Sequence, residues 1–215
     1  MEQSHRRGKL IVIEGIDGSG KQTQWQLLVG RLGAVGVDFP RYKQSMVGKL
    51  LKKLLLTEDF QKLTPYVATL PFVLDQYLWR RDEGKRLIEE GKMVVANRYV
   101  TSNIHQIYKL TGAARNKFAR WFWQLAYQEL GLPRPDVVLV LDVKPEVARG
   151  LMRTRNNDQA DRDWAYQLAA YRGYQQMCRR EKSWVKVACR EKNKLLTRPQ
   201  ISDRMIKILQ DEQLV

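Results

Sequence analysis

A glycine-rich segment near the start of the chain has the residue types and spacing that bind phosphate groups. Residues 15–21 read Gly-Ile-Asp-Gly-Ser-Gly-Lys and satisfy the pattern G-x-x-x-x-G-K. Glycines allow backbone N–H groups to turn toward phosphate oxygens, and the lysine reaches the terminal phosphates of a nucleotide. The residues expected to bind the nucleotide phosphates are Gly15, Asp17, Gly18, Ser19, Gly20, Lys21, Gln22 and Thr23.

The position after the lysine departs from the common form of this loop. The usual Ser or Thr, whose hydroxyl binds the magnesium ion of the nucleotide, is replaced by Gln22, and a hydroxyl follows only at Thr23. We therefore expect Thr23 to contact a phosphate and the metal to be held mostly through water.

The segments around the loop have the patterns of elements that could position it. Apolar, β-branched residues precede the loop and predict a strand, while apolar residues at helical spacing follow it. The same two patterns alternate along the rest of the chain. Strands are predicted at residues 10–13, 93–96, 137–141 and 184–188, and helices at 25–32, 47–55, 64–79, 85–90, 118–125 and 202–209.

Strands separated by long helical segments indicate right-handed βαβ units. The predicted fold is a three-layer α/β fold, with a parallel sheet of about five strands, helices on both faces, and a single domain spanning residues 1–215. Ligands of such folds bind beyond the carboxyl ends of the strands. Residues 14–21, residues 97–98 and Asp142 each follow an apolar strand and are expected to line that edge.

Composition narrows the class of protein. The 215 residues include 38 Lys and Arg against 23 Asp and Glu, a net charge of +15 that predicts anionic partners. The 44% apolar content excludes wholesale disorder, and no apolar run is long enough to cross a bilayer. Only two cysteines and two histidines are present, which excludes a Cys/His zinc cluster. We expect a cytoplasmic protein without a membrane partner.

Further motifs, in a consistent order along the chain, resemble the thymidylate kinase family of P-loop nucleoside monophosphate kinases. The first is the segment Ile-Val-Ile-Glu-Gly-Ile-Asp-Gly-Ser-Gly-Lys-Gln-Thr-Gln at residues 11–24. The resemblance covers nearly the whole chain and implies phosphoryl transfer from ATP to dTMP, with Mg²⁺ as cofactor. The motifs that follow imply which residues bind the acceptor nucleotide.

Three segments resemble the family's acceptor site: Phe-Pro-Arg-Tyr at 39–42, Leu-Pro-Phe-Val-Leu-Asp-Gln at 70–76, and Asn-Arg-Tyr-Val-Thr-Ser-Asn at 97–103. By this resemblance Arg98 binds the dTMP phosphate, Phe72 stacks on the thymine ring and Asn103 hydrogen-bonds the base edge. The full set implied to bind dTMP is Phe39, Arg41, Tyr42, Phe72, Gln76, Arg98, Asn103 and Gln106.

A lid over residues 149–163 is implied by the same resemblance. The phosphate loop has Gly18 and Ser19 rather than an arginine, as in the bacterial type of the family, in which lid arginines supply catalytic cations. The implied catalytic residues are Asp17, Lys21, Arg98, Arg153 and Arg155. The lid is also implied to include Asp158, Asp161 and Tyr166.

Two residues depart from the family pattern. Asn97 stands where the family has an aspartate that helps to hold magnesium, so we expect the metal to be held weakly by Asp17 and Asn97 through water. Gln76 stands where the family has an arginine that contacts the base, so the base preference is open. A kinase for another nucleoside monophosphate is the first alternative.

A second alternative is a catalytically weakened P-loop protein that binds nucleotide or nucleic acid. The +15 charge would favour binding of nucleic acid, but no nucleic-acid module is visible in the sequence, which argues against this partner.

A homodimer is implied by the resemblance, with the apolar stripe at residues 118–125 as one possible buried face. Five basic residues and no acidic ones lie between Phe39 and Leu55, which exceeds what one acceptor phosphate requires.

Overall fold

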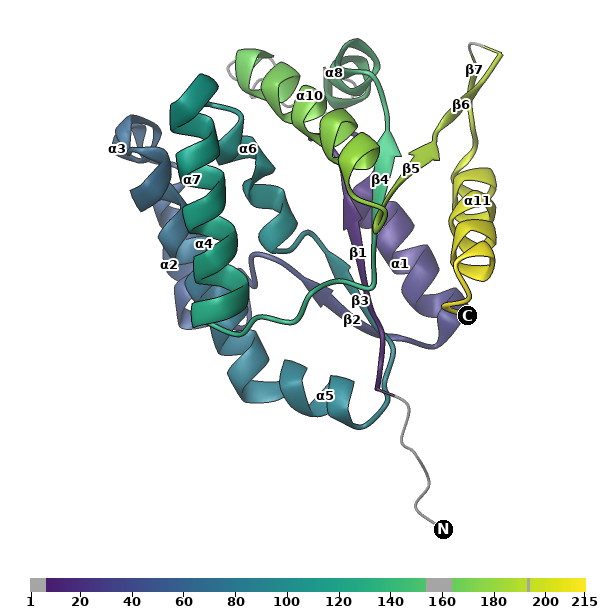
Figure 1. The fold of residues 1–215 in the computed structure, drawn as a ribbon. Helices are drawn as coiled ribbons and strands as arrows, with labels where there is room; N and C mark the ends of the chain where they lie inside the picture. The colour runs from purple at the N-terminus through teal and green to yellow at the C-terminus, as the bar shows by residue number, and fades with distance from the viewer. Residues whose placement is uncertain (1–6, 154–163, 193) are drawn as a thin grey trace.

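The computed structural model describes residues 7–153, 164–192 and 194–215 and contains a five-stranded parallel sheet (Figure 1). The strand order β2-β3-β1-β4-β5 places the strand that precedes the glycine-rich loop at the centre of the sheet. The predicted parallel α/β fold is therefore confirmed. The strands are β1 (Leu10–Glu14), β2 (Val35–Asp38), β3 (Val94–Asn97), β4 (Val137–Asp142) and β5 (Trp184–Ala188), and a separate hairpin pairs β6 (Arg190–Glu191) with β7 (Lys194–Leu195).

Helices cover both faces of the sheet. Figure 1 shows α1 and α11 to one side of the strands and α4, α6 and α7 to the other. The α-helices are α1 (Lys21–Leu32), α2 (Met46–Leu54), α3 (Glu58–Lys62), α4 (Pro65–Trp79), α5 (Lys85–Glu89), α6 (Ile104–Ile107), α7 (Gly112–Gln124), α8 (Pro145–Arg153), α10 (Trp164–Arg180) and α11 (Arg198–Asp211). The elements η1 (Arg80–Gly84) and η3 (Leu125–Glu129) are π-helical turns, and η2 (Val100–Asn103) is a 3-10 helix.

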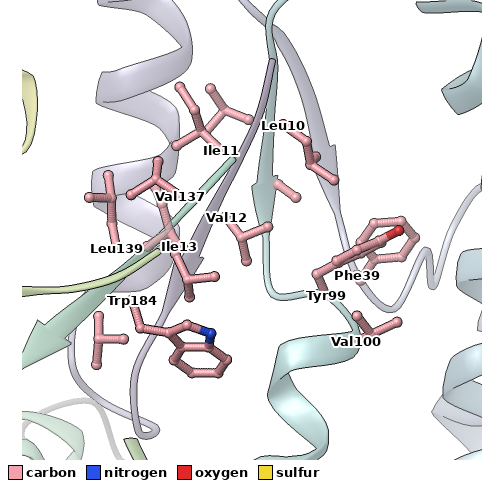
Figure 2. Packing of buried hydrophobic residues seen from close by; sticks show 14 of the residues in the cluster. Leu10, Ile11, Val12, Ile13, Phe39, Tyr99, Val100, Val137, Leu139 and Trp184 are labelled. Atoms are coloured by element: carbon pink, nitrogen blue, oxygen red, sulfur yellow. The ribbon is translucent and has the colours of Figure 1, made fainter. Parts of the chain in front are cut away.

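The central strand β1 is fully enclosed. Its register pairs Ile11 with Val95 of β3 on one side and with Val137 of β4 on the other. All five of its residues have no exposed surface, as expected for a parallel strand that is covered on both faces. Figure 2 shows its apolar side chains in one core with Val137, Leu139 and Trp184. The phosphate loop therefore follows directly from a strand that is buried along its whole length.

The edge strand β2 is a feature that hydrophobic periodicity did not reveal. It is four residues long and pairs on one side only, with β3. Val35 and Gly36 are exposed, and Val37 is its buried residue. A strand with one buried side chain and a glycine carries too weak an alternation to be recognised in sequence.

Helix boundaries differ from the sequence expectation at two places. The predicted helices at 64–79 and 85–90 form one continuous helical segment, because the π-helical turn η1 joins α4 to α5. The last helix begins at Arg198 rather than at residue 202. Thr197 caps it by accepting a hydrogen bond from the Gln200 backbone N–H, and the Gln200 side chain bonds back to Thr197.

The apolar stripe on α7 packs inside the molecule. Phe118 and Phe122 are fully buried, and the Tyr66 ring of α4 lies 4.8 Å from the Phe118 ring, centre to centre. These two side chains are therefore core residues and not part of a dimer face, whereas Trp121 and Leu125 of the same stripe are only partly buried. Helical periodicity identifies a buried face, but it does not identify whether the covering side chains belong to the same chain.

Within the described part of the chain, no helix is long and apolar enough to cross a membrane. Cys178 and Cys189 are both free thiols.

The burial of Phe118 predicts a large loss of stability on truncation. We expect Phe118→Ala to lower the free energy of unfolding by about 3–5 kcal/mol, because it leaves a cavity in a closed aromatic cluster. The measurement is urea denaturation followed by tryptophan fluorescence. Arg120→Ala, at an exposed position of the same helix, should change it by less than about 0.5 kcal/mol. An equal loss in both variants would contradict the assignment of Phe118 to the core.

Candidate active site

The glycine-rich loop joins β1 to α1 at the carboxyl edge of the sheet. Gly15, Gly18 and Gly20 all have positive φ angles, of 149°, 77° and 88°, which other residues rarely adopt. Lys21 begins α1 and is 6% exposed. Its Nζ donates to the carbonyl oxygens of Gly15 at 2.9 Å and Ile16 at 2.7 Å. The loop thus has the strand–turn–helix context that the phosphate-binding motif requires.

Helix α8 packs directly against the phosphate loop. A Cβ atom added at Gly18 would lie 2.6 Å from the Ala148 carbonyl oxygen and 2.8 Å from Cγ of Met152. Gly18 is therefore required both for its φ angle and for this close approach. The helix that leads into the predicted lid is consequently in contact with the loop that is predicted to bind the donor phosphates.

Asp17 of the loop contacts both the lysine that is predicted to bind the donor phosphates and the arginine that is predicted to bind the acceptor phosphate. Arg98 donates a short hydrogen bond from Nη2 to Oδ1 of Asp17, and Nζ of Lys21 lies 3.8 Å from the same oxygen. Burial alone would raise the pKa of Asp17, but the charges of Arg98 and Lys21 outweigh burial and hold it well below its usual range. Burial, together with the charge of Arg98, lowers the pKa of Lys21 to about 7.

Gln167 of α10 holds the other side of Asp17. Its Nε2 donates to Oδ2 of Asp17 at 2.8 Å, and its Oε1 accepts from the Asp17 backbone N–H at 3.1 Å. One amide therefore fixes both the backbone and the carboxylate of Asp17. The sequence analysis did not identify Gln167, and no local signal could have done so, because the two residues are 150 positions apart in the chain.

Glu14 anchors the segment that carries Arg98. It is fully buried at the end of β1 and accepts hydrogen bonds from the hydroxyls of Thr101 at 2.6 Å and Ser102 at 2.7 Å. Tyr174 of α10 donates its hydroxyl to Glu14 at 2.7 Å. The sequence placed Glu14 at the carboxyl edge of the sheet but gave it no role. A charged residue that ends an otherwise apolar strand was the available signal.

Arg98 occupies a strained backbone position within this segment. Its φ angle is 64°, in the left-handed region, and its N–H donates to the Ile13 carbonyl at 3.0 Å. The anchoring of the following residues to Glu14 stabilises this conformation. Strain of this kind is typical of functional positions.

His105 is buried against α10. Its Nε2 lies 3.0 Å from the Tyr174 hydroxyl, and its ring lies 5.0 Å from the ring of Tyr166, centre to centre. Burial, reinforced by the charge of Arg98, lowers the pKa of His105 to about 3. The imidazole is therefore neutral near pH 7 and adds no charge to the site.

The segment at residues 39–42 is held by a buried carboxylate. The Arg41 side chain donates from Nε to Oδ1 of Asp75 at 3.2 Å, and Ser45 donates its hydroxyl to the same oxygen at 2.5 Å. Arg41 is thus buried with a partner of its own, whereas Tyr42 is exposed. Phe39 is 3% exposed and packs against Trp79 and Tyr99 in the core.

The remaining predicted acceptor residues come from α4, η2 and α6. Asn103 accepts from the Thr69 hydroxyl at 3.1 Å and donates to the Val100 carbonyl, so both ends of its amide are engaged. Gln76 and Gln106 are buried, and the Oε1 atom of each has no hydrogen-bond partner among the residues that the structure describes. An unpaired buried oxygen costs about 1–3 kcal/mol and is expected where a ligand supplies the partner.

Asn97, Asp38 and Gln22 form a polar cluster beside the loop. Nδ2 of Asn97 donates to Oδ1 of Asp38 and to Oε1 of Gln22, both at 2.8 Å. Within the described ranges, Oδ1 of Asn97 is buried and has no hydrogen-bond partner. Burial raises the pKa of Asp38, opposed by the hydrogen bond from Asn97 and the charge of Arg98. Asp38 was not identified from sequence because it ends the unrecognised strand β2.

Part of the predicted lid lies outside the described residues. Arg155, Asp158 and Asp161 fall within 154–163, and the side chain of Arg153 is also outside the description, although α8 ends at this residue. Tyr166 is described. Nζ of Lys109 lies 5.1 Å from the centre of its ring.

Comparison with protein families and curated relatives gives one consistent result. Residues 13–201 match the family model described as thymidylate kinase. The chain is 34% identical over 154 residues to a thymidylate kinase from Mycobacterium tuberculosis, covering 68% of this chain and 71% of the relative. It is 30% identical over 174 residues to one from an Exiguobacterium species, covering 78% and 80%.

Solved structures give the same result for the fold. The thymidylate kinase of Candida albicans superposes with a TM-score of 0.73 at 22% identity, covering 97% of this chain and 93% of that one. The thymidylate kinase of Ehrlichia chaffeensis superposes with a TM-score of 0.70 at 18% identity, covering 94% and 99%.

The low pKa of His105 predicts a pH-dependent loss of stability. In the unfolded chain a histidine gains its proton near pH 6.5, whereas folded His105 stays neutral down to about pH 3. Stability should therefore fall as pH decreases below 6.5, by about 2 kcal/mol from this residue at pH 5. Urea denaturation at pH 7.5 and pH 5 measures this. His105→Gln should lose less stability than wild type over the same interval, and equal losses would contradict the assignment.

Proposed function

The chain belongs to the thymidylate kinase family, and we propose that it transfers the γ-phosphoryl group of ATP to dTMP, giving dTDP and ADP. The observation that supports this most directly is the contact of Asp17 with both Lys21 and Arg98. A lysine suited to donor phosphates and an arginine suited to an acceptor phosphate thereby converge on one carboxylate. This is the arrangement needed to bring two phosphate groups together.

In the proposed reaction ATP lies on the phosphate loop and the dTMP phosphate binds Arg98. An oxygen of the acceptor phosphate attacks the γ-phosphorus while the bond between that phosphorus and the β–γ bridging oxygen breaks. Such transfers need positioning and cationic stabilisation more than covalent help from the protein. Lys21 and Arg98 supply two of the cations, and the arginine can bind the phosphate through two parallel N–H groups.

The state of Lys21 is consistent with this role. Burial and Arg98 lower its pKa, so anionic phosphates beside Nζ would favour the charged form and raise the pKa again. Nucleotide binding and the charge of the lysine therefore reinforce each other. Nζ now donates to two loop carbonyls and would exchange these for phosphate oxygens.

The neighbourhood of Asn97 fits a hydrated magnesium ion. Magnesium prefers oxygen ligands and retains several waters, and the ion would neutralise charge on the ATP phosphates. Among the described residues no cluster of three or more His, Cys, Asp or Glu could hold a metal. The unpaired Oδ1 of Asn97 and the neighbouring Asp38 carboxylate are oxygens of the required kind. The Asp17 carboxylate already binds Arg98 and Gln167.

The base pocket is proposed from the same resemblance. Phe72 stacks on thymine, Asn103 and Gln76 contact the base edge, and Gln106 lies near the deoxyribose. The unpaired Oε1 atoms of the two glutamines are free to accept hydrogen bonds from the nucleotide. Two further expectations stay predictions. Arg153 and Arg155 of the lid are predicted to stabilise the transition state as cations. The protein is predicted to be cytoplasmic.

Turnover with a panel of acceptors tests the proposed function. In a coupled assay of ADP release we expect dTMP to be preferred over dUMP, dCMP and dGMP. Arg98→Ala should lower kcat/KM for dTMP by roughly 10²-fold or more, because it removes the charged donor to the acceptor phosphate. Arg120→Ala, at an exposed site on α7, is the matched control and should retain wild-type turnover. A clear preference for dGMP would contradict the assignment to dTMP.

We also propose a homodimer that uses an exposed face of α4. Val67, Leu70 and Leu74 are each 47% exposed and, at a spacing of i, i+3 and i+7, form one apolar stripe along this helix. Exposed apolar stripes of this kind are typical of interfaces between subunits. A second copy of the chain is the partner implied by the family resemblance.

A charge placed on this stripe should dissociate the dimer. We expect Leu70→Glu to shift the protein from dimer to monomer in sedimentation velocity at micromolar concentration, because a carboxylate would be buried without a partner. Val35→Glu, at an exposed apolar position on β2, should leave the dimer intact. A wild-type protein that sediments as a monomer would contradict the proposal.

A further inference from the structure

The carboxyl ends of β2 and β3 place two polar residues side by side. Asp38 is the last residue of β2, Asn97 is the last residue of β3, and the parallel register pairs them directly. Nδ2 of Asn97 donates to Oδ1 of Asp38 at 2.8 Å. The two side chains therefore act as one unit at the edge of the sheet where the phosphate loop also lies.

This unit borders the residue that follows the phosphate-loop lysine. Nδ2 of Asn97 also donates to Oε1 of Gln22, in the first turn of α1. In P-loop proteins the hydroxyl at the position of Gln22 and an aspartate at the end of a neighbouring strand hold the magnesium ion of the nucleotide. Here both positions carry amides, and neither amide supplies the negative charge that a hard cation prefers.

Asp38 supplies the missing charge within hydrogen-bond distance of the amide. In the part of the chain that the structure describes, Asp38 receives the Asn97 amide but has no cation within 4 Å, whereas Asp17 is paired with Arg98 and Lys21. The Asp38 charge is therefore not neutralised by a contacting side chain. Oδ1 of Asn97 is buried and unpaired, which adds a second oxygen to the same place.

The presence of an amide at position 97 follows from the same geometry. An aspartate there would place two carboxylates at the distance now spanned by the Asn97–Asp38 hydrogen bond, and like charges that close repel. An asparagine converts this contact into a favourable one and orients the carboxylate. Asp38 and Asn97 are thus explained together: the end of β2 carries the carboxylate, and the end of β3 carries the amide that orients it.

We propose that Asp38 is the carboxylate that holds the hydrated magnesium ion of the bound nucleotide, and that Asn97 is the residue that positions it. This inference rests on the proposed binding of a magnesium nucleotide to the phosphate loop. It does not depend on which nucleotide is the acceptor. The edge strand β2 thereby supplies a metal-binding carboxylate from outside the glycine-rich loop.

A cycle of four proteins tests whether the carboxylate and the amide can be exchanged between positions 38 and 97. The proteins are wild type, Asp38→Asn, Asn97→Asp and the double variant that carries both changes. The measurement is Mn²⁺ affinity in the presence of ADP, from the electron paramagnetic resonance signal of free Mn²⁺, so no turnover is required. We expect Asp38→Asn to weaken Mn²⁺ binding by about 10-fold or more. The double variant restores one carboxylate to the pair and should bind within about 3-fold of wild type.

A matched control and a second readout separate this effect from general damage. Asp59→Asn removes one negative charge at an exposed site on α3 and should leave Mn²⁺ affinity unchanged. In EDTA, Asn97→Asp should have a lower thermal midpoint than wild type because its two carboxylates repel, and the double variant should recover that midpoint. If Asp38→Asn does not fold, the comparison of wild type with the double variant and Asn97→Asp still tests the exchange.

Unchanged Mn²⁺ affinity in Asp38→Asn would overturn the inference. So would a double variant that binds Mn²⁺ as weakly as Asp38→Asn, because the carboxylate would then not be exchangeable between the two strand ends. The outcome is independent of the acceptor assay. A wild type that binds Mn²⁺ and ADP but does not phosphorylate dTMP would contradict the proposed function and leave the role of Asp38 standing.

Discussion

The arrangement of the site depends on one buried carboxylate, Glu14, at the end of the central strand. Removing a carboxylate from water is costly unless hydrogen bonds replace its hydration. The protein meets this requirement with hydroxyl donors from η2 and from α10. Because these donors belong to segments far apart in the chain, satisfying Glu14 fixes the position of the segment that begins with Arg98 and of α10 together.

Asp17 extends this constraint to the phosphate loop. It is held by Gln167 from α10 and binds Arg98, so α10 contacts Asp17 through Gln167 and Glu14 through Tyr174. Since α10 directly follows the predicted lid segment, its position is coupled to both halves of the site. The neutral state of His105 belongs to the same packing, because an added proton would place a third positive charge beside Arg98 and Lys21.

Sequence patterns predicted the features whose causes are local. The glycine-rich turn, its lysine and the apolar central strands depend on residues within a few positions of one another, and they were predicted correctly. The strand β2 was missed because an edge strand buries too little to show a period. Asp38 was missed together with β2, which it ends, and its partner Asn97 is 59 positions away. Gln167 was missed because its contact with Asp17 joins residues that are 150 positions apart. The stripe around Phe118 was recognised as apolar, but its partner proved to be the chain itself.

The contact at Gly18 also limits which residues the phosphate loop can carry. Any side chain there would meet the Ala148 carbonyl oxygen, so the phosphate loop can acquire a long cationic residue at this position only if α8 moves away. A loop arginine and a closely packed α8 are therefore mutually exclusive solutions within this architecture. A chain that keeps the glycine can gain positive charge beside the loop only from another segment, and replacing the glycine would require the helix to be repacked at the same time.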